Sequence, residues 1–183
     1  MNVLIIGKSA LAKAVSPLLD EHNVTVVGRP EYDIESKYEC HRIIRDHNPD
    51  CVILTQGLIG NDIWKNLTVN NTSTIYLITE FYNKMKNGQI IAVSSAQVNW
   101  QSWPGKDIHQ LVYATAKTSL SQFCSYMNRK NDNEKPISIQ VYEPQNFPSK
   151  MTPNSEQDIN EVAKELQLLV DNPRISVLQG LNR

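Results

Sequence analysis

Short runs of consecutive apolar residues, rich in valine and isoleucine, recur along this chain. Their hydrophobicity is continuous rather than alternating, which is typical of strands that are buried on both faces of a parallel sheet. The pattern predicts six strands: Val3–Ile6, Val24–Val27, Cys51–Leu54, Ile90–Val93, Ile137–Val141 and Ile175–Leu178.

The segments between these runs read as helices. The pattern predicts five of them: Ala10–His22, Ser36–Asp46, Asn61–Met85, Val112–Arg129 and Glu156–Val170. Pro17 lies inside the first helix and removes one of its backbone hydrogen bonds, so we expect that helix to begin or bend there. Strands and helices that alternate in this way predict an α/β protein with a Rossmann-like, doubly wound parallel sheet in three α/β/α layers.

The length of the chain bounds its organisation. Its 183 residues suffice for one sizeable core, but not for a cofactor domain and a separate substrate domain. We therefore expect residues 1–183 to form a single nucleotide-binding domain, with a site made by loops at one edge of the sheet. The net charge of −1 and the scattered charged residues argue against nucleic acid as a partner.

Two further sequence features suggest where the protein works. No apolar run approaches the roughly 20 residues of a membrane span, and the N-terminus lacks the basic start and cleavage site of a signal peptide, so we expect a cytoplasmic protein with no membrane partner. The cysteines, Cys40, Cys51 and Cys124, are widely spaced and lack a surrounding histidine set. We expect reduced packing residues and no metal site.

Tyr113 and Lys117, one helical turn apart, suggest redox chemistry on a carbonyl or an alcohol. They follow the predicted strand that leads into Ser95. A phenol has a reference pKa of about 10, and an ammonium about 4 Å away on the same helix face would supply the roughly 4 kcal/mol that brings this pKa near 7. Tyr82 and Lys86 share the spacing, but no strand ending in hydroxyl side chains precedes them, so we interpret them as a solvated helix face.

The first predicted strand leads into the place where a dinucleotide-binding protein has a glycine-rich turn and a helix N-terminus. The turn here consists of Gly7, Lys8, Ser9, Ala10 and Leu11. Only Gly7 is a glycine, so an ordinary strand-to-helix turn is a comparable alternative. Arg29, after the second strand, is a cation of the kind that favours NADP(H), and Lys8 offers a second one. Glu31 nearby keeps NAD(H) possible.

With these motifs, the chain resembles a compact and divergent member of the short-chain dehydrogenase/reductase family, over nearly its whole length. The resemblance implies that Ser95, Tyr113, Lys117 and Asn70 are the catalytic serine, tyrosine, lysine and asparagine, with Ser94 a less favoured serine. It also implies cofactor contacts, including an adenine contact at Asp33 and nicotinamide-side contacts near Pro144. The full set is Gly7, Lys8, Ser9, Leu11, Arg29, Asp33, Gly57, Lys117, Pro144 and Ser149.

The resemblance further implies a mechanism. The tyrosine would exchange a proton with the alcohol as hydride moves to or from the nicotinamide, while the lysine lowers the tyrosine pKa and holds the ribose hydroxyls. The serine would hydrogen-bond the substrate oxygen, and the asparagine would position a water. We therefore expect an NADP(H)-dependent oxidoreductase that interconverts a small carbonyl and an alcohol.

Two questions stay open at this point. Few glycines in the first turn leave a non-catalytic NAD(P)-binding sensor or scaffold as the alternative function. The resemblance also implies a homodimer or homotetramer that pairs through the helices bearing Asn70 and Tyr113. Apolar positions on those helices would serve a dimer as easily as a core: Leu77, Phe81, Leu120 and Phe123.

Overall fold

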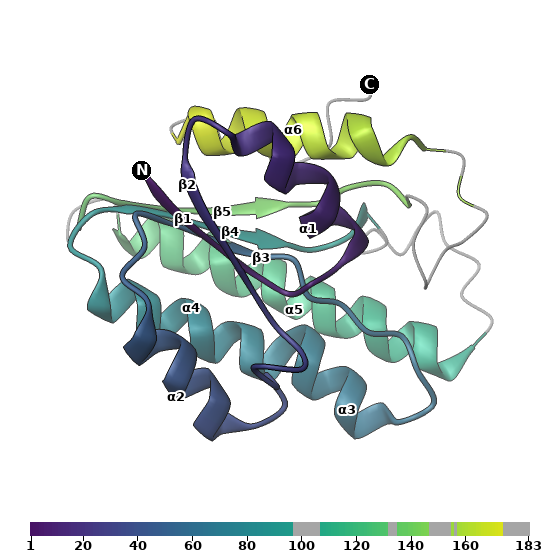
Figure 1. Cartoon of the computed structure of the whole chain (residues 1–183). Coiled ribbons are helices and arrows are strands. Elements are labelled where there is room, and N and C mark those ends of the chain that lie inside the picture. Colours follow the sequence, from purple (N-terminus) through teal and green to yellow (C-terminus); the bar gives the residue numbers. More distant parts are fainter. Residues whose placement is uncertain (97–106, 132–134, 147–154, 156, 174–183) are drawn as a thin grey trace.

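The computed structural model describes residues 1–96, 107–131, 135–146, 155 and 157–173. It has a central parallel sheet in the order β2-β1-β3-β4-β5, with helices on both faces (Figure 1). The strands are β1 (Asn2–Ile6), β2 (Asn23–Val27), β3 (Cys51–Leu54), β4 (Gly88–Val93) and β5 (Ile137–Tyr142). The predicted Rossmann-like class is confirmed. The sixth predicted strand, Ile175–Leu178, lies outside the described residues.

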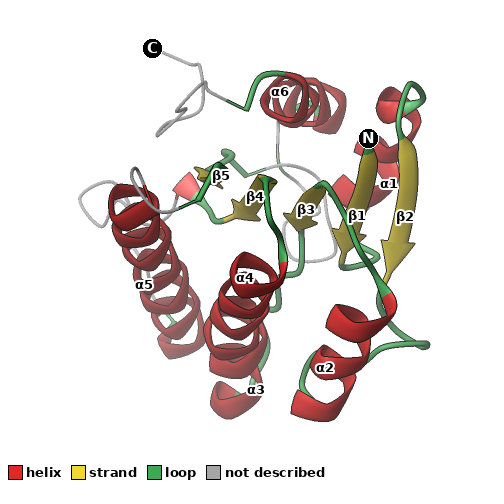
Figure 2. Cartoon of the chain, turned by 90° about the vertical axis from the view of Figure 1, so that its left-hand side faces the viewer, coloured by secondary structure: helices red, strands yellow, loops and turns green. Residues whose placement is uncertain are grey.

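Both faces of the sheet are covered, which explains the continuous apolar runs. Figure 2 shows α1 and α6 on one face and α2, α3, α4 and α5 on the other. In β1, Val3 and Ile5 pack in the core cluster beneath α1 and α6, whereas Leu4 and Ile6 pack in the cluster that faces α2, α4 and α5. Successive side chains of a strand point to opposite faces, so a strand between two helix layers needs apolar residues at every position.

The helices before β3 end or begin close to specific polar and proline residues. Helix α1 (Ala10–Val15) is followed by a 3-10 turn, Ser16–Leu19, with Pro17 in its first positions, where no backbone donor is needed. The α-helix therefore ends earlier than the predicted His22, for the reason that Pro17 indicated. Helix α2 (Lys37–Asp46) begins after Ser36, whose hydroxyl accepts a hydrogen bond from a first-turn backbone N–H.

The long helix predicted after β3 is divided. It consists of α3 (Ile63–Leu67), a π-helical turn (Thr68–Thr72) and α4 (Ser73–Lys84). Helix α5 (Ile108–Asn131) begins four residues before the predicted Val112, and α6 (Ile159–Asp171) begins three residues after the predicted Glu156. A π-turn inside a helix often marks a functional site, and this one contains Asn70.

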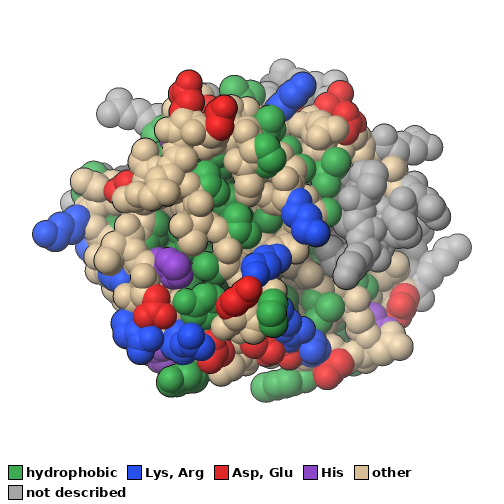
Figure 3. All heavy atoms as spheres, viewed as in Figure 1, with side chains coloured by type: hydrophobic (Ala, Val, Ile, Leu, Met, Phe, Trp, Pro, Cys, Tyr) green, Lys and Arg blue, Asp and Glu red, His purple; other side chains and the backbone are tan. Residues whose placement is uncertain are grey.

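The surface carries both signs of charge. Figure 3 shows basic and acidic side chains interspersed on the face seen in Figure 1, with no large area of one sign. Within the described ranges, no helix combines the length and the apolar character that crossing a bilayer requires.

Candidate active site

The crevice between the ends of β1 and β3 is the topological switch point of the sheet. From β1 the chain passes to β2 on one side and then to β3 on the other, and ligands of such sheets bind at the carboxyl edge there. Gly7 has a φ of +109°, and a Cβ at this position would lie 2.8 Å from the backbone nitrogen of Gln56. The Thr55 hydroxyl donates to Gly7 O over 2.9 Å. The loops after β1 and β3 are therefore closely joined, and Gly7 is required for the join.

Tyr113 and Ser95, which the sequence proposed as partners, meet in the structure. They are 6% and 7% exposed, and the Ser95 side chain lies near enough to the Tyr113 phenol to interact with it. Burial raises the pKa of Tyr113 to about 12, and the interaction with Ser95 acts in the opposite direction. Tyr113 is therefore fully protonated at neutral pH.

Lys117 is 2% exposed and lies under the ends of β3 and β4. Its ammonium donates to Val93 O over 2.9 Å and to Gln56 O over 3.2 Å. Burial lowers the pKa of Lys117 to about 8. These two bonds account for two of the three donors of an ammonium.

The expected effect of Lys117 on Tyr113 is not found in this structure. The Lys117 Nζ lies 5.9 Å from the centroid of the Tyr113 ring, and the two carbonyls hold it there. The pKa of Tyr113 is raised by burial rather than lowered by the ammonium. Spacing along the helix placed the two residues on one face, but it did not indicate that carbonyl oxygens from β3 and β4 would bind the amine.

The two neighbouring serines have different surroundings. The Ser94 hydroxyl donates to Lys117 O over 3.2 Å and lies 2.8 Å from the Ser121 hydroxyl. Ser121 in turn lies 2.7 Å from a carboxylate oxygen of Glu143. Burial raises the pKa of Glu143, and the bond from Ser121 offsets part of this rise. Ser94 therefore joins β4 to α5 and the end of β5, while Ser95 faces Tyr113. The sequence analysis did not identify this Ser94–Ser121–Glu143 network.

Asn70 is fully buried in the π-turn, and its side chain is engaged within the protein. Its amide donates to Leu58 O over 2.6 Å and to Asn66 Oδ1 over 2.7 Å, and its Oδ1 accepts from the Leu58 N–H over 3.0 Å. Asn70 thus holds the segment that follows β3. The side-chain amide of Asn70 makes these bonds within the protein, so it is not the group that would position the expected water.

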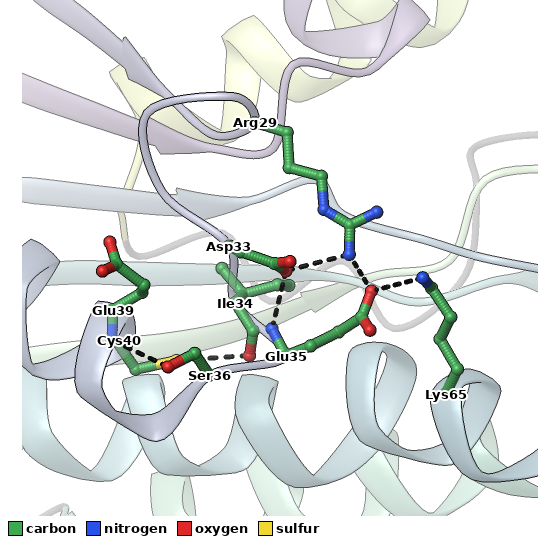
Figure 4. Close-up of polar contacts among 8 residues, drawn as sticks. All are labelled: Arg29, Asp33, Ile34, Glu35, Ser36, Glu39, Cys40 and Lys65. Carbon is green, nitrogen blue, oxygen red and sulfur yellow. Dashed lines mark hydrogen bonds and ion pairs between the residues drawn. The ribbon is translucent and has the colours of Figure 1, made fainter.

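The cations expected at the cofactor are paired with carboxylates. Lys8 forms an ion pair with Glu31. Arg29 lies 2.9 Å from Asp33 and also contacts Glu35 (Figure 4). Arg29 and the expected adenine contact Asp33 are therefore brought together, in the loop between β2 and α2.

The other expected cofactor residues fall into two groups. Ser9 and Leu11 serve α1 itself, because the Ser9 hydroxyl accepts from the Ala12 N–H over 3.0 Å and the Leu11 side chain is buried in the core. Gly57 is exposed after β3, and Pro144 is buried after β5, where its carbonyl accepts from the Ala96 N–H. Ser149 lies outside the described residues.

The second Tyr/Lys pair does not form a solvated helix face. Tyr82 is 8% exposed and belongs to the core, and α4 ends at Lys84, before Lys86. The interpretation was wrong for Tyr82, because its side chain packs in the core and Lys135 lies over its ring. The three cysteines are free and buried, as expected. Among the described residues, no group of three His, Cys, Asp or Glu side chains is arranged to hold a metal ion.

No protein-family model and no curated protein matches the sequence, whereas solved structures match the fold. A short-chain dehydrogenase from Burkholderia cenocepacia in complex with NADP has a TM-score of 0.81 at 13% identity, over 95% of this chain and 92% of that chain. BdcA in complex with NADPH gives 0.79 at 18% identity, over 92% and 86%. A putative 3-oxoacyl-reductase from Bacillus thuringiensis gives 0.78 at 17% identity, over 100% and 98%. The chain therefore has the short-chain dehydrogenase/reductase fold.

Proposed function

We propose that this protein, with its short-chain dehydrogenase/reductase fold, is an NADP(H)-dependent oxidoreductase that interconverts a small carbonyl and an alcohol. One observation carries the proposal. The buried Ser95 side chain lies near enough to the Tyr113 phenol to act on its pKa, and Lys117 lies one helical turn away from Tyr113, beside the switch point of the sheet. A phenol, a hydroxyl and an ammonium that converge in this way can hold and protonate one substrate oxygen.

The residues at the crevice fit a dinucleotide. The loops after β1 and β3 meet at Gly7 and Gln56, so a ligand at the switch point lies against both. The third donor of the Lys117 ammonium is suited to a ribose hydroxyl. Arg29, after β2, is a cation of the kind that binds a phosphorylated ribose, which supports NADP(H) as the cofactor. A nicotinamide bound here supplies or accepts the hydride.

The chain's own residues handle the proton. Tyr113, with its raised pKa, enters the reduction of a carbonyl as the protonated acid and donates its proton to the substrate oxygen. Ser95 hydrogen-bonds the same oxygen. Lys117, with a pKa of about 8, is mainly protonated at neutral pH, so its ammonium is available there as a hydrogen-bond donor.

The proposal is tested by titrating NADPH and NADH against the protein and then screening a panel of carbonyl compounds by absorbance. Tyr113→Phe removes the proton donor, so we expect turnover to fall by about 10²- to 10⁴-fold with cofactor binding retained. Tyr126→Phe, on an exposed part of the same helix, is the matched control and should behave as the wild type. Normal turnover by the Tyr113→Phe variant would show that Tyr113 is not the acid.

A non-catalytic NAD(P)-binding sensor is the second candidate function. It is favoured by the raised pKa of Tyr113 and by the turn after β1, where Gly7 is the only glycine. The same titration separates the two candidates. Tight cofactor binding without turnover of any carbonyl or alcohol class would favour the sensor.

A further inference from the structure

Two cations from different elements converge on a single carboxylate oxygen beside the crevice. Lys65, on α3, has its Nζ 3.0 Å from Oε1 of Glu35. Arg29, two residues after the end of β2, contacts the same oxygen through Nη2. Figure 4 shows the Arg29 and Lys65 side chains approaching the same oxygen of the Glu35 carboxylate from two different directions. The three side chains form what we call the Glu35 bridge.

The carboxylate of this bridge is held in place by its own loop. The Glu35 backbone N–H donates to Oδ1 of Asp33 over 3.1 Å, and the same Oδ1 accepts from Arg29 over 2.9 Å. Ser36, the next residue, caps α2. The loop therefore presents Glu35 to Arg29 and Lys65, and Asp33 orients both the loop and the guanidinium.

The bridge has the charge pattern of an anion site that already contains an anion. A guanidinium and an ammonium directed at one oxygen are the groups that bind phosphate, the first by a planar fork and the second as a point charge. A phosphate monoester brings a charge of about −1.5 to −2 at pH 7 and three acceptor oxygens, against one charge on a carboxylate. Arg29 and Lys65 therefore match a phosphate better than they match Glu35.

We propose that Glu35 is an internal competitor for a ribose 2′-phosphate, and that Lys65 is the second cation that reads this phosphate. The inference rests on the proposed function and specifies how its site distinguishes phosphorylated from unphosphorylated cofactors. On binding, the phosphate displaces the Glu35 carboxylate from Arg29 and Lys65, and no covalent bond changes.

The exposure of the bridge makes this exchange feasible. The side chains of Arg29, Lys65 and Glu35 are 52%, 35% and 26% exposed. Ion pairs with this exposure are individually weak, so they yield to a better ligand. Their competition should nevertheless lower the affinity for a 2′-phosphorylated ligand by about two- to fivefold.

The test uses the full chain and two probes that differ in the 2′-phosphate, adenosine 2′,5′-bisphosphate and 5′-AMP, with affinities measured by calorimetry. Glu35→Gln removes the competing charge, so binding of the bisphosphate should tighten about two- to fivefold while that of 5′-AMP is unchanged. Lys65→Met should weaken the binding of the bisphosphate by a similar factor or more, again without an effect on the binding of 5′-AMP. NADPH and NADH should follow the same pattern.

Two matched controls lie on α2. Glu39→Gln removes a carboxylate that pairs with Arg42, and Lys37→Met removes an ammonium that lies over the Tyr76 ring. Neither contacts the Glu35 bridge, so neither should change the affinity ratio of the two probes. Circular dichroism confirms that each variant is folded.

The possible outcomes separate this inference from the proposed function. If the Glu35→Gln and Lys65→Met variants change the affinities for both probes equally, or change neither, the bridge only joins the loop to α3. The inference is then wrong, while the proposed function stands. If the wild type binds neither NADPH nor NADH, both are wrong. If the wild type prefers NADH and Glu35→Gln reverses this, the inference holds and the cofactor preference is corrected.

Discussion

At the scale of single residues, the site depends on ionisable groups that are buried away from water. Tyr113 and Lys117 are both nearly inaccessible, and burial moves their pKa values in opposite directions, up to about 12 and down to about 8. Each shift favours the neutral form, because a charge loses its hydration in the interior. The phenol thereby remains a proton donor over the physiological range, whereas the ammonium can lose its proton in mildly alkaline solution.

The lowered pKa of Lys117 predicts a rise in stability with pH. Between pH 8 and 10.5 the unfolded chain keeps a proton on this lysine that the folded chain has released, so the free energy of unfolding increases with pH in this window. The full increase is about 3 kcal/mol. We expect urea unfolding of the wild type to gain about 2 kcal/mol between pH 7 and 9.5, relative to Lys117→Met measured at the same pH values.

Lys164→Met, on an exposed position of α6, controls for the loss of a lysine as such. It should leave the pH dependence of the wild type unchanged. If the free energy of unfolding changes with pH in the same way for the wild type and for Lys117→Met, burial does not destabilise the charged form of Lys117.

At the scale of elements, the π-turn between α3 and α4 organises the site through side-chain amides within it and the Thr74 hydroxyl just after it. The Ser73 N–H donates to Thr68 O, five residues back, in place of the usual four. The Thr74 hydroxyl satisfies Val69 O over 2.9 Å. Asn71 donates to Ala116 O over 3.1 Å, next to Lys117. The turn therefore fixes α5 as well as the loop after β3.

Asn70 is expected to contribute more to stability than an ordinary helix residue. Asn70→Ala leaves the half-buried N–H and C=O of Leu58 without their partner, at a cost of about 1–3 kcal/mol for each group that water does not reach. We expect a loss of about 2–4 kcal/mol in urea unfolding. Asn83→Ala, at an exposed position of α4, should change the free energy of unfolding by less than about 0.5 kcal/mol. Equal effects of the two substitutions would mean that the Asn70 bonds contribute little.

At the scale of the whole molecule, the structure separates core positions from positions that are free to meet a partner. Leu77, Phe81 and Leu120 are fully buried in the cluster between the sheet and its helices, so they stabilise the core and are not available to a dimer. Phe123 is only partly buried, and Tyr126, one turn further along α5, is 60% exposed. A pairing of copies through α5 would rest on these two aromatic residues.

We expect the protein to form a homodimer or homotetramer, with α5 in the contact. Light scattering after size exclusion at micromolar concentration measures the mass directly. Tyr126→Glu places a charge in the contact and should shift the mass toward the monomer, whereas Tyr38→Glu, at an equally exposed aromatic position on α2, should not. A wild-type monomer at this concentration would contradict the expectation.

Local patterns in the sequence determined the strands, the layers and the principal pair of the site. Continuous apolar runs predicted all five described strands, because a strand between two helix layers has no solvated face. The spacing of Tyr113 and Lys117 placed both residues on one face of α5, because helix periodicity acts over a single turn. Pro17 likewise ended its α-helix for a local steric reason.

Other properties of the site depend on neighbours that are distant in the sequence. The partners of the Lys117 amine come from β3 and β4, and one partner of Glu35 comes from α3. The different surroundings of Ser94 and Ser95 likewise depend on how α5 packs against the sheet. Burial sets the pKa of a buried group, and charge pairing decides whether a cation is available to a ligand. Both effects add up over every nearby group, so they are determined only once the sheet and its helices are assembled.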